Sequence, residues 1–315
     1  MGKLKPTQSA LWAHINKTYI TEERVRDLSG FKSGSVNFKL ALWNPQTNGV
    51  RYLKTLIYNL CASLTNDDWK RISKMRNRHI GDPLTIKYNG EEVCLDYLQA
   101  NYEVAFITDK LPVSGINILE IGAGYGRTCH AISSNFEVRA YYIIDLDNCL
   151  TLSRKYLQEV MDRVRFSKIH FISVEDVEDI DELKTLNFDL CINIDSFAEM
   201  TPETVKYYLS YVNAHADYLY VKNPVGKYSD ASLISSYGNS DVQLALDVGV
   251  LREVVDVYDK QAIKRQVPRF VQAYQPGDEW ECVANSWAPP WSYYWQALYK
   301  KLTSQGSDRS ASSSA

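Results

Sequence analysis

The sequence lacks the long apolar runs and the paired cysteines that mark membrane-spanning and disulfide-rich proteins. No stretch of the chain approaches the ~20 apolar residues that a membrane span requires. Its six cysteines are scattered and form no C-x-x-C pair, so neither a zinc site nor a disulfide framework is indicated. The polar, lysine-bearing N-terminus has no apolar signal-peptide core. We therefore expect a soluble cytoplasmic protein with no membrane partner.

The chain also has little net charge. Its 35 Lys and Arg residues against 38 Asp and Glu residues give a formal charge of −3. This balance provides no long-range attraction to phosphates, so we expect no nucleic acid partner. A hydrophobic fraction of 45% in 315 residues is typical of a globular protein with a large core. The oligomeric state stays open, and a homo-oligomer is allowed.

The most informative segment is residues 118–126, where an apolar strand pattern runs into a glycine-rich turn. The strand pattern ends near Glu120, and Gly122, Gly124 and Gly126 follow at every second position. Glycine tolerates positive φ and lets the backbone approach a ligand closely. The residues after Gly126 can form a helix whose N-terminus points at that ligand. The pattern predicts a nucleotide-like cofactor site.

The spacing around this turn indicates which cofactor. A dinucleotide-binding G-x-G-x-x-G motif needs a glycine where this chain has Arg127. Glu120 would disfavour a pyrophosphate and favour an ammonium group. The next predicted strand ends at Asp145, before Leu146, and a carboxylate there can accept ribose hydroxyls. We therefore predict S-adenosylmethionine, which has a cationic amino-acid end and no phosphate, bound by Glu120, the three glycines, Asp145 and Leu146.

The wider pattern predicts an α/β fold. Helical spacing dominates the first part of the chain, Asn89-Gly90 predicts a β-hairpin at 84–94, and a helix follows at about 96–109. Strands and helices then alternate, which favours a doubly wound parallel sheet. The predicted strands are 116–121, 139–145, 168–174, 188–194 and 217–222, and the predicted helices are 124–135, 148–163 and 202–214.

These patterns give three regions. We predict a helical N-terminal cap at 1–110, a cofactor-binding core at 111–302 and a Ser-rich disordered tail at 303–315. Residues 229–265 read as one long helix with loops. Two further segments, 269–274 and 292–299, are expected to close the sheet as an antiparallel pair.

On these residues the chain resembles the class I S-adenosylmethionine-dependent methyltransferases. More narrowly, it resembles the sugar O-methyltransferases, a bacterial family found with polysaccharide and glycosylated natural-product pathways. The narrower match rests on residues 76–83, 118–127 and 188–200 and on the Trp-rich C-terminus. The resemblance implies a Rossmann-like methyltransferase sheet and methyl transfer to a hydroxyl of a sugar or glycosylated small molecule. One departure is Ala198, where the family often has a histidine before Glu-Met.

Candidate catalytic residues follow the fourth predicted strand. A sugar hydroxyl is a poor nucleophile, and a positioned base typically adds about 10²–10⁴-fold in rate. We predict Asp195 as that base or as the acceptor of the substrate hydroxyl, with Glu199, one helical turn on, orienting the sugar or a charged neighbour. The alternative is that Asp195 or Ser196 caps the next helix. Asn193 is the candidate for the cofactor's methionine end. Magnesium could bind this carboxylate pair, but no ligand-spaced cluster compels a metal, and we predict none.

Five further residues are candidates for substrate binding. His79 and Asp82 could fold over the substrate or cofactor, or form a plain turn. Lys222 ends the fifth predicted strand and either faces the same cleft or is solvated. Trp287 and Trp291 predict an aromatic substrate wall, with a lid packed on the core as the alternative.

Two other functional classes remain open. The first is a small-molecule N- or O-methyltransferase of secondary metabolism that acts on a non-sugar acceptor. The second is a non-enzymatic cofactor-binding or scaffold protein. A nucleic acid methyltransferase is disfavoured, because Asp195-Ser-Phe-Ala stands where an Asp/Asn-Pro-Pro-Tyr motif would be expected.

Overall fold

The computed structural model describes residues 9–23, 26, 32, 45–177, 181–228 and 239–302. Contacts divide the chain into two compact units, Met1–Ala62 and Ser63–Ala315. The first unit contains helices α1 (Ala10–Thr18) and α2 (Pro45–Ala62). The second unit begins well before the boundary that we placed at residue 110. The predicted tail at 303–315 lies outside the described residues.

The second unit opens with a helix, a hairpin and another helix. Helix α3 (Asn66–Lys74) begins with a capping box, in which Thr65 and Asp68 each bond the other's backbone N–H. Strands β1 (Thr85–Tyr88) and β2 (Glu91–Cys94) are joined by Asn89 and Gly90, whose φ values are 49° and 80°. Positive φ at both positions is what a type I′ turn requires, so the predicted hairpin is confirmed. Helix α4 (Leu95–Thr108) follows directly.

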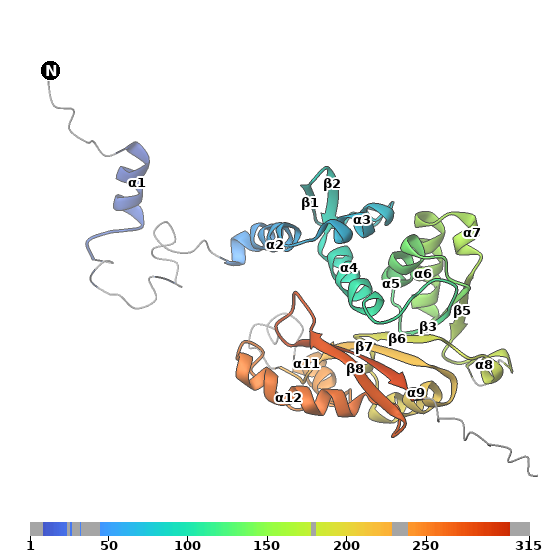
Figure 1. Ribbon diagram of the computed structural model, residues 1–315. Coiled ribbons are helices and arrows are strands. Elements are labelled where there is room, and N and C mark those ends of the chain that lie inside the picture. The colour runs from blue at the N-terminus through green and yellow to red at the C-terminus, as the bar shows by residue number, and fades with distance from the viewer. Residues whose placement is uncertain are drawn as a thin grey trace, which may run out of the picture. The chain divides into compact units, whose positions relative to one another are not determined.

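A seven-stranded sheet forms the centre of this unit, in the order β5-β4-β3-β6-β7-β9-β8 (Figure 1). The first five strands in this order run parallel, and β9 is antiparallel to both of its neighbours. The doubly wound α/β fold that the sequence predicted is therefore confirmed. The strands are β3 (Asn117–Ile121), β4 (Ala140–Asp145), β5 (Ile169–Ser173), β6 (Leu190–Ile194), β7 (Tyr218–Pro224), β8 (Trp280–Trp287) and β9 (Tyr294–Lys301).

Helices cover both faces of the sheet. Successive strand residues point to opposite sides, so each face carries apolar side chains that pack against helices. Ile118 joins an apolar cluster with α4, α5 and α6, whereas its neighbour Leu119 joins a second cluster with α9 and α12. The helices that follow β3 are α5 (Arg127–Asn135), α6 (Asp147–Val160), α7 (Arg163–Phe166), α8 (Asp181–Thr185), α9 (Pro202–His215), α11 (Asn239–Asp247) and α12 (Lys260–Ala273).

The C-terminal region departs from the sequence prediction. Residues 269–274 were expected to be a strand, but 269–273 form the end of α12 with Tyr274 as its C-cap, and the antiparallel partner of β9 is β8. The short apolar alternation at 269–274 is part of a helical pattern in which Ile263, Gln266 and Phe270 are buried at three- and four-residue intervals. Two separate helices, α11 and α12, also replace the single long helix predicted across 229–265, whose residues 229–238 lie outside the described part.

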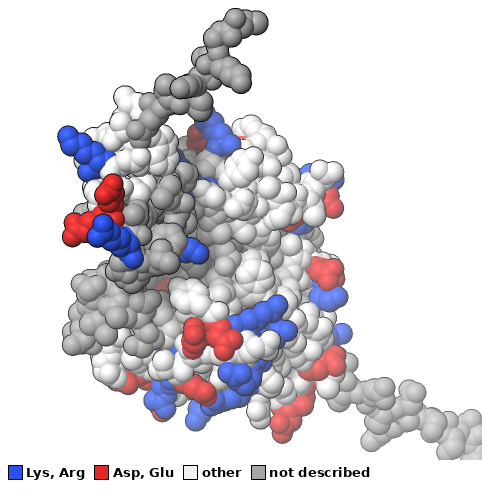
Figure 2. All heavy atoms as spheres, turned by 90° about the vertical axis from the view of Figure 1, so that its left-hand side faces the viewer, with Lys and Arg blue, Asp and Glu red and all other residues white. Residues whose placement is uncertain are grey.

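The described surface carries both charge signs. In Figure 2, Lys and Arg side chains alternate with Asp and Glu, and neither sign forms a continuous patch over the described residues of that face. Of the helices in the described ranges, none has the length and apolar character needed to cross a bilayer.

Candidate functional site

The glycine-rich loop leaves the carboxyl end of β3 with all three glycines at positive φ. The φ values are 75° at Gly122, 59° at Gly124 and 89° at Gly126. A Cβ on Gly122 would lie 2.2 Å from Ser196 Oγ, and one on Gly126 would lie 2.8 Å from Leu157 Cδ1. At Gly124 nothing lies within 4 Å of that position. Gly122 and Gly126 are therefore required by packing, while Gly124 leaves room for a ligand to approach the backbone.

Asp145 holds this loop from the end of the neighbouring strand β4. Its Oδ2 accepts the N–H of Gly124 at 2.8 Å, and its Oδ1 accepts the N–H of Leu146 at 2.8 Å. Each carboxylate oxygen can accept a further hydrogen bond. The structure thus brings Gly124, Asp145 and Leu146 together, with acceptor capacity left for hydroxyl groups.

Glu120 lies beneath the loop rather than on its open side. Its side chain is almost fully buried and accepts a hydrogen bond of 2.7 Å from the hydroxyl of Tyr141. Burial raises the pKa of Glu120 to about 7, against the opposing effect of the Tyr141 hydrogen bond. Its contact with a ligand ammonium group stays a prediction.

Asp195 follows β6 in a strained backbone conformation. Its φ of 66° and ψ of −39° are unusual for a residue other than glycine and cost about 1–3 kcal/mol. Its N–H donates to the carbonyl of Lys222 at 2.9 Å. Its side chain makes no capping bond, and the cap of α9 is Thr201. The structure therefore does not support the capping alternative for Asp195.

The Asp195 carboxyl group combines burial with an unused acceptor. Within the described part of the chain, its Oδ1 is buried and has no hydrogen-bond partner. Burial raises the pKa of this carboxyl group above its usual value, and the charge of Lys222 and the neighbouring Tyr294 hydroxyl oppose that rise. An incoming hydroxyl could supply the missing donor to Oδ1.

Asp195 lines a cavity of about 480 Å³. Its apolar wall comes from α11 and the residues after it, and its other polar lining residues are Glu199, Lys227, Tyr228, Tyr293 and Tyr294. Burial and the nearby Asp195 raise the pKa of Glu199. The cavity lies beyond the carboxyl ends of β6 and β7, where doubly wound sheets bind ligands, and its volume suits a small molecule.

A buried ion cluster underlies the site. Lys222, 1% exposed, donates to Glu103 Oε1 at 2.8 Å and to Gln99 Oε1 at 3.0 Å. Nη2 of Arg127 donates to both carboxylate oxygens of Glu103 at 2.8 Å. Although burial opposes it, the charges of Arg127 and Lys222 hold the pKa of Glu103 below its usual value. Lys222 is therefore no solvated strand end, and it joins α4, the start of α5 and β7.

Two tryptophans extend this cluster outward. The indole N–H of Trp291 donates to Gln99 Oε1 at 3.1 Å, and that of Trp287 donates to the carbonyl of Trp291 at 2.7 Å. Both rings keep a large exposed area, 47% for Trp287 and 39% for Trp291. Neither tryptophan lines the Asp195 cavity. Both lie at the outer edge of the Lys222 ion cluster.

Asn193 joins the ends of three strands and has no exposed surface. Its Nδ2 donates to the carbonyl of Ile121 at 3.0 Å, and its Oδ1 accepts from Asn223 Nδ2 at 3.0 Å and from the N–H of Phe197 at 3.3 Å. In this arrangement Asn193 positions the loops around Gly122 and Asp195. A direct bond to a cofactor would have to replace one of these contacts.

The structure separates His79 and Asp82 from the other candidates. Both are exposed in the turn between α3 and β1, where Asp82 has a φ of 52°. His79 lines a different cavity, and neither residue lines the one at Asp195. Among the described side chains, no cluster of three or more His, Cys, Asp or Glu residues is arranged to hold a metal ion.

Comparison with known proteins gave matches to solved structures alone. No protein-family model and no curated protein matches the chain. The chain is similar to an O-methyltransferase from Bacillus cereus in complex with SAH, with 10% identity over 80% of this chain and 100% of that one, at a TM-score of 0.45.

Two further solved structures are similar over a smaller share of their own length. The mitomycin 7-O-methyltransferase MmcR matches at 11% identity over 65% of this chain and 57% of that one, with a TM-score of 0.42. The pyocyanin biosynthetic protein PhzM matches at 14% identity over 64% of this chain and 55% of that one, with a TM-score of 0.40. The chain thus spans little more than half the length of these two proteins. Likeness at this level identifies neither a substrate nor a cofactor.

Glu120→Gln should change how stability depends on pH. The pKa of Glu120 is about 7 in the folded protein against 4.5 for an unperturbed group, so its ionisation favours the unfolded state as pH rises through this window. At pH ~8 the variant should be the more stable protein by up to about 3 kcal/mol, with little difference at pH ~4. Urea denaturation at both pH values measures this, and equal pH dependence in both proteins would contradict it.

Glu103→Ala should destabilise the protein by about 3–5 kcal/mol, because it leaves Lys222 and Arg127 as buried cations without their shared partner. Glu137→Ala is the matched control. Glu137 also pairs with two cations, Arg165 and Lys168, but its side chain is 67% exposed, so the loss should stay below about 1 kcal/mol. Similar losses in the two variants, measured by chemical denaturation, would contradict a structural role for the buried cluster.

Proposed function

We propose that this protein is an S-adenosylmethionine-dependent methyltransferase that transfers a methyl group to a hydroxyl of a sugar or glycosylated small molecule. The observation that carries the proposal is Asp195. It is held in a strained conformation with one buried, unpartnered carboxylate oxygen, and it lines a small-molecule cavity beyond the strands next to the glycine-rich loop. Strain and an unsatisfied buried acceptor are features of functional sites.

The proposed cofactor site is the loop at Gly122, Gly124 and Gly126, with Asp145 beside it. The open space at Gly124 and the spare acceptor capacity of Asp145 suit an adenosyl group whose ribose hydroxyls donate to the carboxylate. Two features disfavour a dinucleotide. Arg127 occupies the third glycine position, and the antiparallel β9 lies between β7 and β8, unlike the 3-2-1-4-5-6 order of dinucleotide folds.

The chemistry assigned to this chain is alignment and proton removal. S-adenosylmethionine, when bound, supplies an electrophilic methyl group on a sulfonium. Transfer would form a bond between the acceptor oxygen and that methyl carbon and would break the carbon–sulfur bond, and Asp195 would take up the hydroxyl proton. Burial raises the pKa of Asp195, which makes it a stronger base than a solvated aspartate. Holding the two reacting groups in line can lower the barrier by ~7–11 kcal/mol.

The polar lining of the cavity supports a polyhydroxylated acceptor. Carboxyl groups of Asp195 and Glu199, the ammonium group of Lys227 and the hydroxyls of Tyr293 and Tyr294 offer donors and acceptors from several directions. Each sugar hydroxyl both donates and accepts, so such a set can fix an orientation. Lys227 is itself held by the carbonyl of Ala198 at 2.8 Å.

A specific observation also favours the second candidate, an N- or O-methyltransferase that acts on a non-sugar acceptor. One wall of the cavity is apolar and comes from Val242, Leu246 and Val248. A flat aromatic acceptor could pack there. A neutral amine acceptor would need less help from a base than a hydroxyl does, so the two candidates differ in how strongly they depend on Asp195.

The cofactor assignment predicts saturable binding of S-adenosylhomocysteine, measured by isothermal titration calorimetry on the full chain. Gly124→Val should weaken this binding at least about tenfold, because the side chain would occupy the open space and would disfavour positive φ. Gly90→Val is the matched control, since it makes the same change at positive φ in open space on the distant hairpin. Binding of NADH with no binding of S-adenosylhomocysteine would overturn the assignment.

The base assignment predicts that Asp195→Asn lowers kcat by about 10²–10⁴-fold while leaving the affinity for S-adenosylhomocysteine intact. Mass spectrometry of methylated products from a glycoside library provides the assay. Because the ionised form is the base, wild-type kcat should fall as pH drops through the raised pKa of Asp195. Asp147→Asn, an exposed acid on α6, is the control. Near-normal turnover of Asp195→Asn would favour an amine acceptor.

A further inference from the structure

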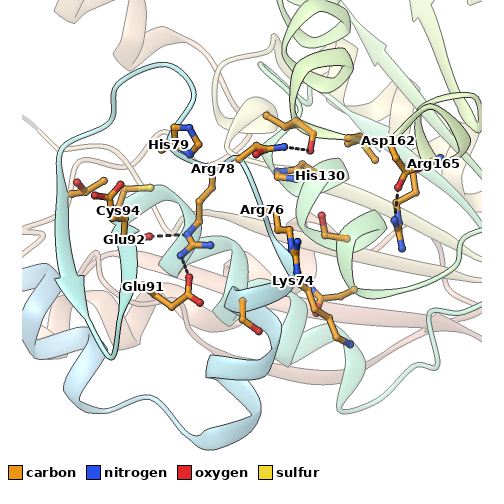
Figure 3. Close-up of a pocket in the computed structure, with 17 residues that line it drawn as sticks. Lys74, Arg76, Arg78, His79, Glu91, Glu92, Cys94, His130, Asp162 and Arg165 are labelled. Carbon is orange, nitrogen blue, oxygen red and sulfur yellow. Dashed lines mark hydrogen bonds and ion pairs between the residues drawn. The ribbon is translucent and has the colours of Figure 1, made fainter.

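A second, larger cavity lies in the same compact unit, away from Asp195. Its volume is about 1210 Å³, and it is bounded by the turn after α3, the β1–β2 hairpin, α5 and the α6–α7 segment (Figure 3). It shares no lining residue with the cavity at Asp195. Its lining includes residues 76–79, the first half of the segment at 76–83 that the sequence analysis singled out and that the proposed chemistry leaves without a role.

Arg78 gives this cavity a fixed cationic wall. The residue is 8% exposed, and its Nε donates to the carbonyl of Glu92 at 2.8 Å. Its Nη1 donates to the carbonyls of Ile72 and Met75 at 3.1 Å and 3.0 Å, and its Nη2 pairs with Glu91. A guanidinium group has five N–H donors, so one remains. This set of bonds holds the wall in one geometry.

Two cations in the cavity have no such partners. In the part of the chain that the structure describes, Lys74 and Arg76 make no side-chain hydrogen bond or ion pair, and both line the cavity. In Figure 3 they enter it from the α3 side, and Arg165 enters from the other. Arg165 is paired with Asp162, which also lines the cavity.

The acids in the cavity do not cancel these charges. Glu91 is paired with Arg78 and Asp162 with Arg165, which leaves Glu92 as the unpaired acid among the lining residues. Two unpaired cations therefore face one unpaired carboxylate. His130 adds no charge near neutral pH, because burial and the nearby Arg78 lower its pKa to about 4. The cavity as a whole favours an anion.

We propose that this cavity binds a phosphate-bearing small molecule, with its phosphate group held between Lys74 and Arg76. Guanidinium and ammonium groups with free donors are the side chains that phosphate oxygens prefer. The volume exceeds that of a phosphate ion, so the ligand carries a further group. Asn135 lines the cavity, and its buried Oδ1 has no partner among the described residues, so it can accept an O–H from that group.

Isothermal titration of the full chain with inorganic pyrophosphate and with ADP, at ~0.15 M salt, tests this site. We expect both probes to bind with Kd below about 1 mM and expect the double variant Lys74→Ala/Arg76→Ala to bind at least about tenfold more weakly. The control Lys87→Ala/Arg139→Ala removes one lysine and one arginine, both exposed, from outside the cavity and should bind as the wild type does.

Three results would overturn the proposal. The first is no saturable binding of either probe up to about 10 mM. The second is equal affinity of the wild type and the Lys74/Arg76 double variant for the probes. The third is that the Lys87/Arg139 control variant loses as much affinity as the Lys74/Arg76 variant does. A fourth result would also overturn it. If Gly124→Val weakens ADP binding and the Lys74/Arg76 double variant does not, the nucleotide binds at the glycine-rich loop and not in this cavity. Binding of S-adenosylhomocysteine is measured in parallel. Its retention in the double variant shows that the fold is intact, and its absence in the wild type would count against the proposed function alone.

Discussion

The candidate site depends on the buried carboxylate of Glu103, which is shared by two cations from different layers. Glu103 lies on α4, Arg127 begins α5 directly after the glycine-rich loop, and Lys222 lies near the end of β7. Two buried charges, Glu103 and Lys222, and the partly buried Arg127 are tolerated only because each is paired, since removal of one partner leaves an uncompensated ion in a medium of low polarity. The cluster therefore fixes the position of the glycine-rich loop relative to β7, whose Lys222 carbonyl accepts the N–H of Asp195. Gln99 and Trp291 continue the same network toward the rim of the site.

The strained backbone of Asp195 depends on the strands that this cluster holds in place. A residue other than glycine keeps a φ of 66° only where its surroundings hold it, and here the backbone bond to Lys222 and the neighbouring Tyr294 in the same cavity wall do so. Both contacts come from the strand pair β7–β9, which is antiparallel. The pair thus positions the Asp195 carboxyl group, the proposed base, in the wall of its cavity.

Much of this arrangement could be predicted from the sequence because its signals are local. The glycines at 122, 124 and 126 and the acid at Asp145 are read from spacing alone, and strand-helix alternation then places them at one edge of a parallel sheet. The ion cluster could not be predicted in this way. Lys222 and Glu103 are 119 residues apart, and the polar residues of α4 resemble an ordinary solvent-exposed face. Strand β8 was missed for a related reason, since its mixed burial gives no clear alternation.

The two cavities have opposite electrostatic character, and this difference restricts what each can hold. The cavity at Asp195 contains two carboxyl groups, whose pKa values burial raises, and one lysine, whereas the larger cavity contains unpaired cations. A phosphate placed near Asp195 would meet carboxylates at short range and would raise the pKa of Asp195 further. The acceptor at Asp195 should therefore present a neutral or cationic group there. The proposed phosphate-bearing ligand fits the cavity beside Lys74 and Arg76 instead, so charge alone would direct the two proposed ligands to different cavities.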